Sequence, residues 1–286
     1  MKKILVTGAN GQLGQCLQKI SSQFEEFEFI FTDSETLDIT IKEEVNDFFW
    51  QNAPDFCINA AAYTAVDLAE TDIEKAFLVN ADGTENLAEA CAENNAQFIH
   101  VSTDYVFDGE NNLAYTEEDF TNPLGVYGAS KLAGDELALE VNPCSVILRT
   151  SWVYSEFGKN FVKTMLNLFA TKEELSIVAD QFGQPTNAND LAEAIMKIIK
   201  SEKITPGIFN FSNLGRISWF DFAEKIAELS EAKIKLNAIE TSQYPTPAKR
   251  PKNSVLDLDK ISKTYGVQLK PWEESLEGCV QILQNN

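Results

Sequence analysis

The chain is poor in histidine and lacks paired cysteines, and both shortages exclude common kinds of site. His100 is the single histidine among 286 residues, so a Ser-His-Asp triad or a histidine zinc site would have to use it. It lies in an apolar run, residues 97–101, which favours a histidine buried in or at the end of a strand. The five cysteines include no CxxC pair, and their number is odd. We therefore expect buried thiols in a reducing, cytoplasmic protein.

Positive charge and long apolar runs are also scarce. Lys and Arg number 23 against 44 Asp and Glu, a net charge of −21, which argues against nucleic acid or an anionic membrane as a partner. A phosphorylated small molecule stays open, because helix N-termini bind phosphates without a net positive charge. No apolar run reaches about 18 residues, so no membrane span is expected. The short apolar start of the chain runs into a glycine turn and predicts a first strand rather than a secretory signal.

Strand-like and helix-like segments alternate along the first half of the chain. The expected strands are residues 3–7, 27–32, 55–60, 97–102 and 145–150. The expected helices are residues 11–21, 41–51, 74–94 and 128–140. This alternation predicts an α/β fold of the Rossmann type, a doubly wound parallel sheet with helices on both faces.

The second half is more mixed. Helical patterns occupy residues 159–170, 189–201, 219–230 and 256–265, and strand patterns occupy residues 175–178 and 208–211. We expect residues 1–150 to form a cofactor-binding Rossmann core. Residues 151–286 would supply the rest of that core, interleaved with a smaller substrate-binding lobe built mainly from residues 218–286.

A glycine-rich turn follows the first expected strand. Gly8, Gly11 and Gly14 are spaced as in dinucleotide-binding turns, where a pyrophosphate approaches the backbone and the next helix packs closely on the strand. Asp33 ends the second expected strand, where a carboxylate binds the adenosine ribose hydroxyls and repels the extra phosphate of NADPH. An ordinary strand-end or turn role for Asp33 is the alternative. These residues predict a nicotinamide cofactor and, taken alone, favour NADH.

Tyr127 and Lys131 stand four residues apart in an expected helix and so share one of its faces. A phenol with a pKa of about 10 is a poor acid-base catalyst at neutral pH, and we expect Lys131 and the oxidised nicotinamide to lower that pKa. Lys131 can also hold the nicotinamide ribose. Thr103, at the end of the fourth expected strand, can donate a hydrogen bond to a substrate carbonyl. Together these residues predict a reductase in which Tyr127 delivers the proton.

Five further segments carry a resemblance to a known family. They are residues 59–67 (NAAAYTAVD), 102–109 (STDYVFDG), 149–154 (RTSWVY), 180–186 (DQFGQPT) and 247–254 (PAKRPKNS). With the glycine turn and the Tyr–Lys pair, they resemble the dTDP-4-dehydrorhamnose reductases of the extended short-chain dehydrogenase/reductase family over nearly the whole chain. The resemblance implies reduction of the 4-keto group of dTDP-4-dehydro-L-rhamnose to dTDP-L-rhamnose, with NADPH or NADH, in the synthesis of cell-surface polysaccharide precursors.

The resemblance also implies roles for single residues. Tyr127 would be the proton donor, Lys131 its partner and Thr103 the carbonyl-binding hydroxyl. Asp104 and Trp152 would contact the sugar. Besides the three glycines and the Tyr–Lys pair, the cofactor would contact Gln12, Leu13, Asp38, Ile39, Ala62, Tyr63 and Thr64.

Some positions depart from the family pattern. Tyr63 replaces a histidine found in many relatives, a change that the cofactor loop should tolerate. Cys16 and Asn189 stand where some relatives carry glutamates that bind magnesium at a dimer contact. Neither side chain is a good magnesium ligand compared with a carboxylate, so we predict no metal. A homodimer stays open.

Aromatic and cationic residues of the second half are candidates for the core or for the ligand site. Trp219 and Phe222 are expected in the core, and Trp152 is expected on the ligand side of its strand. Arg250 lies in a proline-rich stretch of an acidic chain, and its guanidinium could bind the pyrophosphate of the substrate in a bidentate way. An ordinary solvated loop is the alternative.

Two other functions stay open. One is a reductase or epimerase of another sugar nucleotide, because a few contacts decide the sugar and the base. The other is a non-catalytic regulatory subunit, since one branch near this family serves methionine adenosyltransferase in that way. The intact Thr103, Tyr127 and Lys131 favour the enzyme.

Overall fold

Six parallel strands form the central sheet of the computed structural model, which describes residues 1–285. The strand order is β10-β5-β4-β3-β1-β2. The strands are β1 (Lys2–Thr7), β2 (Phe27–Phe31), β3 (Phe56–Asn59), β4 (Gln97–Thr103), β5 (Val146–Thr150) and β10 (Gly207–Asn210). β3 and β5 are buried along their whole length, as expected for a parallel sheet covered on both faces. The predicted Rossmann-type α/β fold is confirmed.

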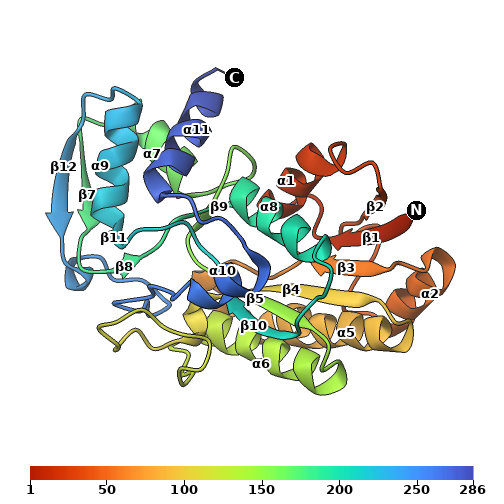
Figure 1. The fold of residues 1–286 in the computed structure, drawn as a ribbon. Helices are drawn as coiled ribbons and strands as arrows, with labels where there is room; N and C mark the ends of the chain where they lie inside the picture. The colour runs from red at the N-terminus through yellow and green to blue at the C-terminus, as the bar shows by residue number, and fades with distance from the viewer. Residues whose placement is uncertain (286) are drawn as a thin grey trace.

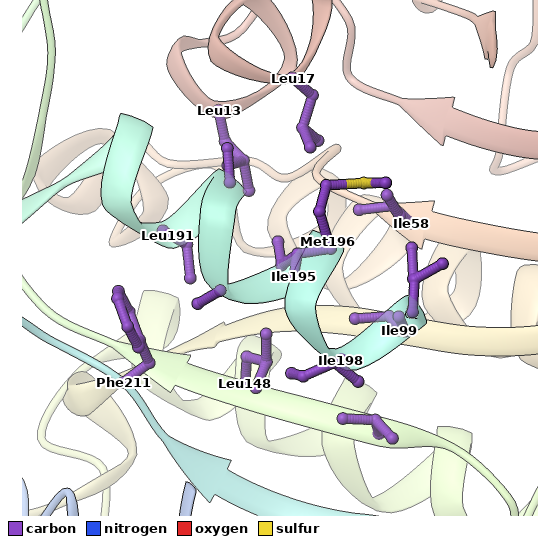
Figure 2. Packing of buried hydrophobic residues seen from close by; sticks show 14 of the residues in the cluster. Leu13, Leu17, Ile58, Ile99, Leu148, Leu191, Ile195, Met196, Ile198 and Phe211 are labelled. Carbon is purple, nitrogen blue, oxygen red and sulfur yellow. The ribbon is translucent and has the colours of Figure 1, made fainter. Parts of the chain in front are cut away.

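Helices cover both faces of this sheet (Figure 1). α2 (Lys42–Asn52), α5 (Gly83–Glu93) and α6 (Val126–Val141) share one apolar cluster with the sheet. α1 (Gln12–Ser21) and α8 (Ala188–Ile199) share the other. Figure 2 shows the cluster that α1 and α8 share with the sheet, in which Leu17 of α1 and Ile195 of α8 lie near Ile58 and Ile99 of the central strands. Burial of these apolar faces fixes the helices and therefore the strand ends that they connect.

The long helix expected at residues 74–94 is interrupted by a π turn. It consists of α4 (Ile73–Phe77), the π segment Leu78–Asp82 and α5. Asn80 of the π segment is fully buried and accepts a hydrogen bond from the Tyr63 backbone at 2.8 Å. Its Nδ2 atom donates to Tyr63 O and to Ser130 Oγ, both at 3.0 Å. The π turn therefore connects the segment after β3 to α6, which carries Tyr127 and Lys131.

Another apolar cluster, separate from the two on the faces of the sheet, lies beside the sheet at the left of Figure 1. It contains α7 (Phe161–Phe169), α9 (Trp219–Leu229), α11 (Trp272–Gln284) and a parallel pair of strands, β7 (Glu174–Val178) and β12 (Lys235–Ile239). β12 and α11 were not among the expected elements. α10 (Asp259–Tyr265) begins later than the expected residue 256. Its Ile261 packs in the cluster that α1 and α8 share with the sheet, not in the cluster beside the sheet. The division of the chain at residue 150, with a lobe mainly from residues 218–286, stays a prediction.

The remaining elements are short. They are α3 (Val66–Ala69), the 3₁₀ turns Asp104–Val106 and Thr241–Gln243, and the strands β6 (Val153–Tyr154), β8 (Phe182–Gly183), β9 (Thr186–Asn187) and β11 (Ile217–Ser218). Across the described residues, no helix combines the length and the apolar character needed to cross a membrane.

The carboxyl ends of four neighbouring strands meet at one edge of the sheet. β1, β3, β4 and β5 end at Thr7, Asn59, Thr103 and Thr150. The chain order reverses beside β1, because β2 lies on one side of β1 and β3 on the other. Ligands of open parallel sheets bind outside the strand ends at such a reversal, so this edge is where a site is expected.

Candidate active site

The glycine turn between β1 and α1 is too closely packed for side chains. Gly8 has a φ of +69°, and a Cβ atom there would lie 2.6 Å from backbone atoms of Ala60 and Ala61. A Cβ atom on Gly14 would collide with the backbone of Gly8 and Ala9. Among the described residues, no side chain caps α1 and no acidic residue lies in its first turn, which leaves N–H groups for a phosphate. The turn therefore fits the pyrophosphate of a dinucleotide.

Asp33 holds its carboxylate near this turn. Asn10 Nδ2 donates to one carboxylate oxygen at 2.6 Å, and the Thr36 hydroxyl donates to the other at 2.9 Å. Hydrogen bonds led by those from Thr36 hold the pKa of Asp33 below its usual value. An ionised carboxylate is suited to accept hydrogen bonds from ribose hydroxyls. Predicted cofactor residues that line the adjoining cavity are Gly8, Gly11, Asp33, Asp38, Ile39 and Ala62.

A second cavity, of about 620 Å³, lies over the ends of the central strands. Gly11 and Ala62 border both cavities, so the two adjoin. The predicted residues that line the second cavity are Gly11, Gln12, Leu13, Ala62, Thr64, Thr103, Asp104, Tyr127, Lys131 and Trp152. The structure therefore brings the expected catalytic residues next to the expected cofactor turn. Gly14, Tyr63 and Arg250 do not line either cavity.

Tyr127 lies in the first turn of α6 and is packed edge-on against Tyr105, with ring centroids 5.6 Å apart. Burial raises the pKa of Tyr127 to about 12, and the Thr103 hydroxyl lowers it by less. In the cofactor-free chain the pKa of Tyr127 is therefore raised, and the lowering expected from Lys131 and the oxidised nicotinamide stays a prediction. A phenol that keeps its proton can still protonate an alkoxide, because an alkoxide is a stronger base than a phenolate.

Lys131 follows one helical turn after Tyr127 and is 2% exposed. Its Nζ atom donates to Val101 O at 2.9 Å and lies 3.0 Å from His100 Nε2. Burial lowers the pKa of Lys131 to about 8, against the opposing effect of Asp135. The expected burial of His100 is confirmed, since none of its surface is exposed. The contact between His100 and Lys131 was not expected.

Asp104 is buried beside Thr103 at the end of β4. Thr103 Oγ1 donates to Asp104 Oδ1 at 3.1 Å and accepts from the Tyr105 backbone at 3.2 Å. Burial raises the pKa of Asp104 to about 6. A substrate carbonyl would therefore compete with the Asp104 carboxylate for the Thr103 proton, and protonation of Asp104 would relieve that competition.

Two tryptophans form one wall of the cavity. Trp152 has a left-handed backbone, with φ of 47°, and its ring stacks on Trp219 with centroids 3.5 Å apart. A Cβ atom on Gly183 would lie 2.5 Å from the Trp152 ring, so that ring is held on both sides. Phe222 is fully buried, as expected, but Trp219 is only partly buried and lines the cavity. Trp219 packs against the apolar cluster, as expected, but its exposure to the cavity was not expected.

Arg250 is paired with a carboxylate in this structure. Its two terminal nitrogens donate to the two oxygens of Asp67 at 2.9 and 2.8 Å. Because Asp67 lies in α3, the pair connects the proline-rich stretch to the sheet domain. Lys249 and Lys252 are exposed. The phosphate contact of Arg250 stays a prediction, and it would require the guanidinium to share its donors or to leave Asp67.

Cys16 and Asn189, the two positions considered above for magnesium, are buried or hydrogen-bonded to other residues. Cys16 is buried, which raises the pKa of its thiol to about 12. Asn189 Nδ2 donates to Glu156 at 2.8 Å, and Lys19 pairs with the same carboxylate at 2.6 Å. Within residues 1–285, His, Cys, Asp and Glu side chains form no group of three or more that could hold a metal ion. The absence of a metal stays a prediction.

Sequence reasoning missed several polar residues behind the cavity. Asn59 and Asn80 are fully buried, and so are Asp135 and Arg149, whose side chains approach to 3.3 Å. A signal was available for Asn59 and Arg149, each of which opens one of the five family-like segments. For the other residues, only the three-dimensional packing shows that they surround His100 and Lys131.

The sheet order, the closely packed glycine turn and the Tyr–Lys pair beside a strand-end threonine define the class as a Rossmann-type short-chain dehydrogenase/reductase. The family described as RmlD substrate binding domain matches residues 1–285. A dTDP-4-dehydrorhamnose reductase from Aggregatibacter actinomycetemcomitans is 45% identical over 97% of this chain and 98% of that protein. The chain belongs to the dTDP-4-dehydrorhamnose reductase family.

Solved structures agree with this assignment. A dTDP-4-dehydrorhamnose reductase from Clostridium acetobutylicum superimposes with a TM-score of 0.95 at 44% identity, covering 99% of both chains. Another from Bacillus anthracis, solved in complex with NADP, gives a TM-score of 0.94 at 39% identity and covers 99% of this chain and 100% of that one.

Proposed function

We propose that this chain reduces the 4-keto group of dTDP-4-dehydro-L-rhamnose to dTDP-L-rhamnose, with NADPH or NADH as the reductant. The observation that carries the proposal is one cavity that holds Thr103, Tyr127 and Lys131 and adjoins the glycine turn. The names of the relatives supply the sugar nucleotide, and the NADP complex of the Bacillus anthracis relative supports a nicotinamide cofactor.

The residues of the chain divide the work of the reaction. When bound, the nicotinamide supplies a hydride to the carbonyl carbon, whose C=O π electrons move onto the oxygen. Thr103 polarises that oxygen through its hydroxyl, and Tyr127 gives the oxygen its proton. The products are an alcohol, the oxidised cofactor and the phenolate of Tyr127. Lys131, one turn further along α6, stabilises that phenolate and contacts the nicotinamide ribose.

The two adjoining cavities indicate how the cofactor and the substrate would be arranged. Asp33, Asp38 and Ile39 would hold the adenosine end, and the turn at Gly8, Gly11 and Gly14 would hold the pyrophosphate, beside Gln12 and Leu13. Ala62, Tyr63 and Thr64 would flank the nicotinamide. Asp104, Trp152 and Arg250 would contact the sugar nucleotide. The ionised Asp33 favours NADH, whereas NADP in a relative shows that the family also accommodates the phosphate.

The alternatives are less well supported. A regulatory subunit would not need the buried Tyr127 and Lys131 in one cavity, and the relatives are named as reductases. A different sugar nucleotide would use the same chemistry. The cytoplasmic location follows only from the cysteine pattern, and a homodimer remains a prediction of the family resemblance.

Replacement of Tyr127 by Phe tests the proposal, since the ring remains and the proton donor is lost. Turnover with dTDP-4-dehydro-L-rhamnose should fall on the order of 10²–10⁴-fold, while cofactor binding, followed by fluorescence, should change little. Thr103→Ala is the matched comparison in the same cavity and should lower turnover without removing the donor. Near-normal turnover of Tyr127→Phe would refute the role of Tyr127.

A further inference from the structure

The only histidine of the chain lies directly behind Lys131 and touches it. His100 lies in β4, opposite Asn59 of β3, and is completely buried. Its Nε2 atom is 3.0 Å from Lys131 Nζ, and its Nδ1 atom is 3.0 Å from Asn59 Nδ2. Each ring nitrogen therefore has one close partner, and the proton of the neutral ring must be on one of the two.

The orientation of the Asn59 amide decides where that proton lies. Asn59 Oδ1 accepts from the Ala61 backbone N–H at 3.1 Å. Asn59 Nδ2 donates to Thr84 Oγ1 at 3.3 Å, and the Thr84 hydroxyl itself donates to Asn80 O at 2.8 Å. A reversed amide would place an NH₂ group against the Ala61 N–H and an oxygen against the Thr84 lone pairs. Two independent contacts thus fix Asn59 with its NH₂ group facing the ring.

The tautomer of His100 follows from this arrangement. His100 Nδ1 must accept the hydrogen bond from Asn59, so the neutral imidazole carries its proton on Nε2. That N–H points at Lys131, where only the lone pair of a neutral amine can accept it. We propose that His100 is a positioning residue for Lys131. The Nε2–H of His100 donates to the lysine amine, which fixes the rotamer of Lys131 and stabilises its uncharged form whenever Lys131 has lost its proton.

Other charged groups lie near this pair but do not replace the contact. Asp135 Oδ1 is 3.8 Å from His100 Nε2, beyond hydrogen-bond distance, and Arg149 Nε is 3.3 Å from the other Asp135 oxygen. The other titratable groups that line the cavity are Asp104, Tyr105, Tyr127 and Lys159. Asp135 favours the charged form of Lys131, whereas the His100 N–H opposes it.

This inference rests on the proposed function and assigns a use to the uncharged amine. After Tyr127 has given up its proton, a protonated Lys131 can pass a proton toward the phenolate and become the neutral amine. The His100 N–H stabilises that amine until solvent supplies the next proton. The pKa of Lys131, which burial lowers to about 8, is compatible with such a return at each turnover.

Nitrogen NMR of the labelled imidazole tests the tautomer without substrate, and the single histidine gives one unambiguous set of signals. We expect a protonated Nε2 and an unprotonated Nδ1 above a pH of about 8, where the uncharged form of Lys131 prevails. The Nε2 signal should also change as Lys131 titrates, at a pH of about 8, and this change should vanish in Lys131→Met. A protonated Nδ1, a charged imidazole or a change that persists in Lys131→Met would overturn the proposal.

Asn59→Asp provides the functional comparison. Its carboxylate would accept from Nδ1, move the proton to that nitrogen and leave Nε2 as an acceptor for the lysine ammonium. The Lys131 titration seen at His100, and the alkaline limb of kcat/KM, should both move upward by about one pH unit. An unmoved titration in a folded variant would contradict the proposal. If the variant does not fold, the spectra of the wild type and Lys131→Met still decide. Failure of turnover with a correct tautomer would instead count against the proposed function.

Discussion

Single residues at this site are adjusted mainly by burial. Burial raises the pKa of Tyr127 to about 12 and of Asp104 to about 6, and lowers the pKa of Lys131 to about 8. Each shift favours the uncharged form of its group, which is the form that burial stabilises. Sequence spacing identified Tyr127 and Lys131 as partners, but it could not give these directions, because they depend on how much water the fold excludes.

Asp33 provides a prediction about cofactor choice at this scale. If its carboxylate binds the ribose hydroxyls, Asp33→Ala should weaken NADH binding more than NADPH binding, because the variant also loses the repulsion of the extra phosphate. Dissociation constants of both cofactors, measured by fluorescence titration, check this. Asp38→Ala is a matched control in the same cavity. Equal weakening of both cofactors by Asp33→Ala would show that Asp33 does not distinguish them.

Asp104 gives a prediction about pH and stability. Its folded pKa of about 6 exceeds its usual value of 3.8, so the folded chain binds this proton more tightly than the unfolded chain. The free energy of unfolding should therefore fall by roughly 3 kcal/mol from this group as pH rises from about 4 to beyond 6.

Asp104→Asn should remove that contribution, so the variant should gain stability relative to the wild type over this pH range. Urea unfolding at several pH values measures the difference. Asp135 and Glu117, whose pKa values burial also raises, are present in both proteins and cancel in the comparison. A stability difference that does not vary with pH would contradict the account of Asp104.

At the scale of elements, the sequence predicted the Rossmann half better than the apolar cluster beside the sheet. Buried parallel strands are apolar runs, and the helices between them have clear faces. β12 was missed because it is a partly exposed, five-residue strand that begins at Lys235. α11 was missed although its buried residues Trp272, Leu276, Cys279 and Val280 recur at helical spacing, so the signal was present in the sequence.

The start of α9 explains why the place of Trp219 at the cavity was missed. Ser218 caps this helix, and its Oγ atom accepts from the Asp221 backbone at 3.1 Å. Trp219 therefore lies in the first helical turn, next to the cavity, whereas Phe222 lies three residues further and faces the apolar cluster. Helical periodicity describes Phe222 correctly, but it cannot show that a helix begins at the wall of a site.

Trp219 gives a prediction at this scale. Trp219→Ala should raise the KM for the sugar nucleotide by up to about tenfold, because Trp152 loses its stacked neighbour. The KM for the cofactor should change little. Phe222→Leu is the control in the same helix and should lower the melting temperature without raising either KM. Steady-state kinetics that show no change in the sugar-nucleotide KM for Trp219→Ala would contradict this role.

At the scale of the whole molecule, the site lies where the sheet edge meets the apolar cluster that contains α7, α9 and α11. β4 and α6 supply Thr103, Tyr127 and Lys131, while the segment after β5 and the first turn of α9 supply the two tryptophans. The pair of Arg250 and Asp67 holds the proline-rich stretch near the same edge. The uncapped start of α1 offers N–H groups to an anionic ligand despite the net charge of −21, while the contribution of Arg250 stays a prediction because Asp67 pairs with it.

Transfer of deuterium tests the central claim most directly. Purified protein is mixed with dTDP-4-dehydro-L-rhamnose and nicotinamide cofactor deuterated at the reactive carbon, and the product is analysed by NMR and mass spectrometry. The account predicts dTDP-L-rhamnose with deuterium on C4 of the sugar, formed in step with cofactor oxidation and nearly abolished in Tyr127→Phe. Absence of cofactor oxidation, or a product without deuterium at C4, would contradict the account.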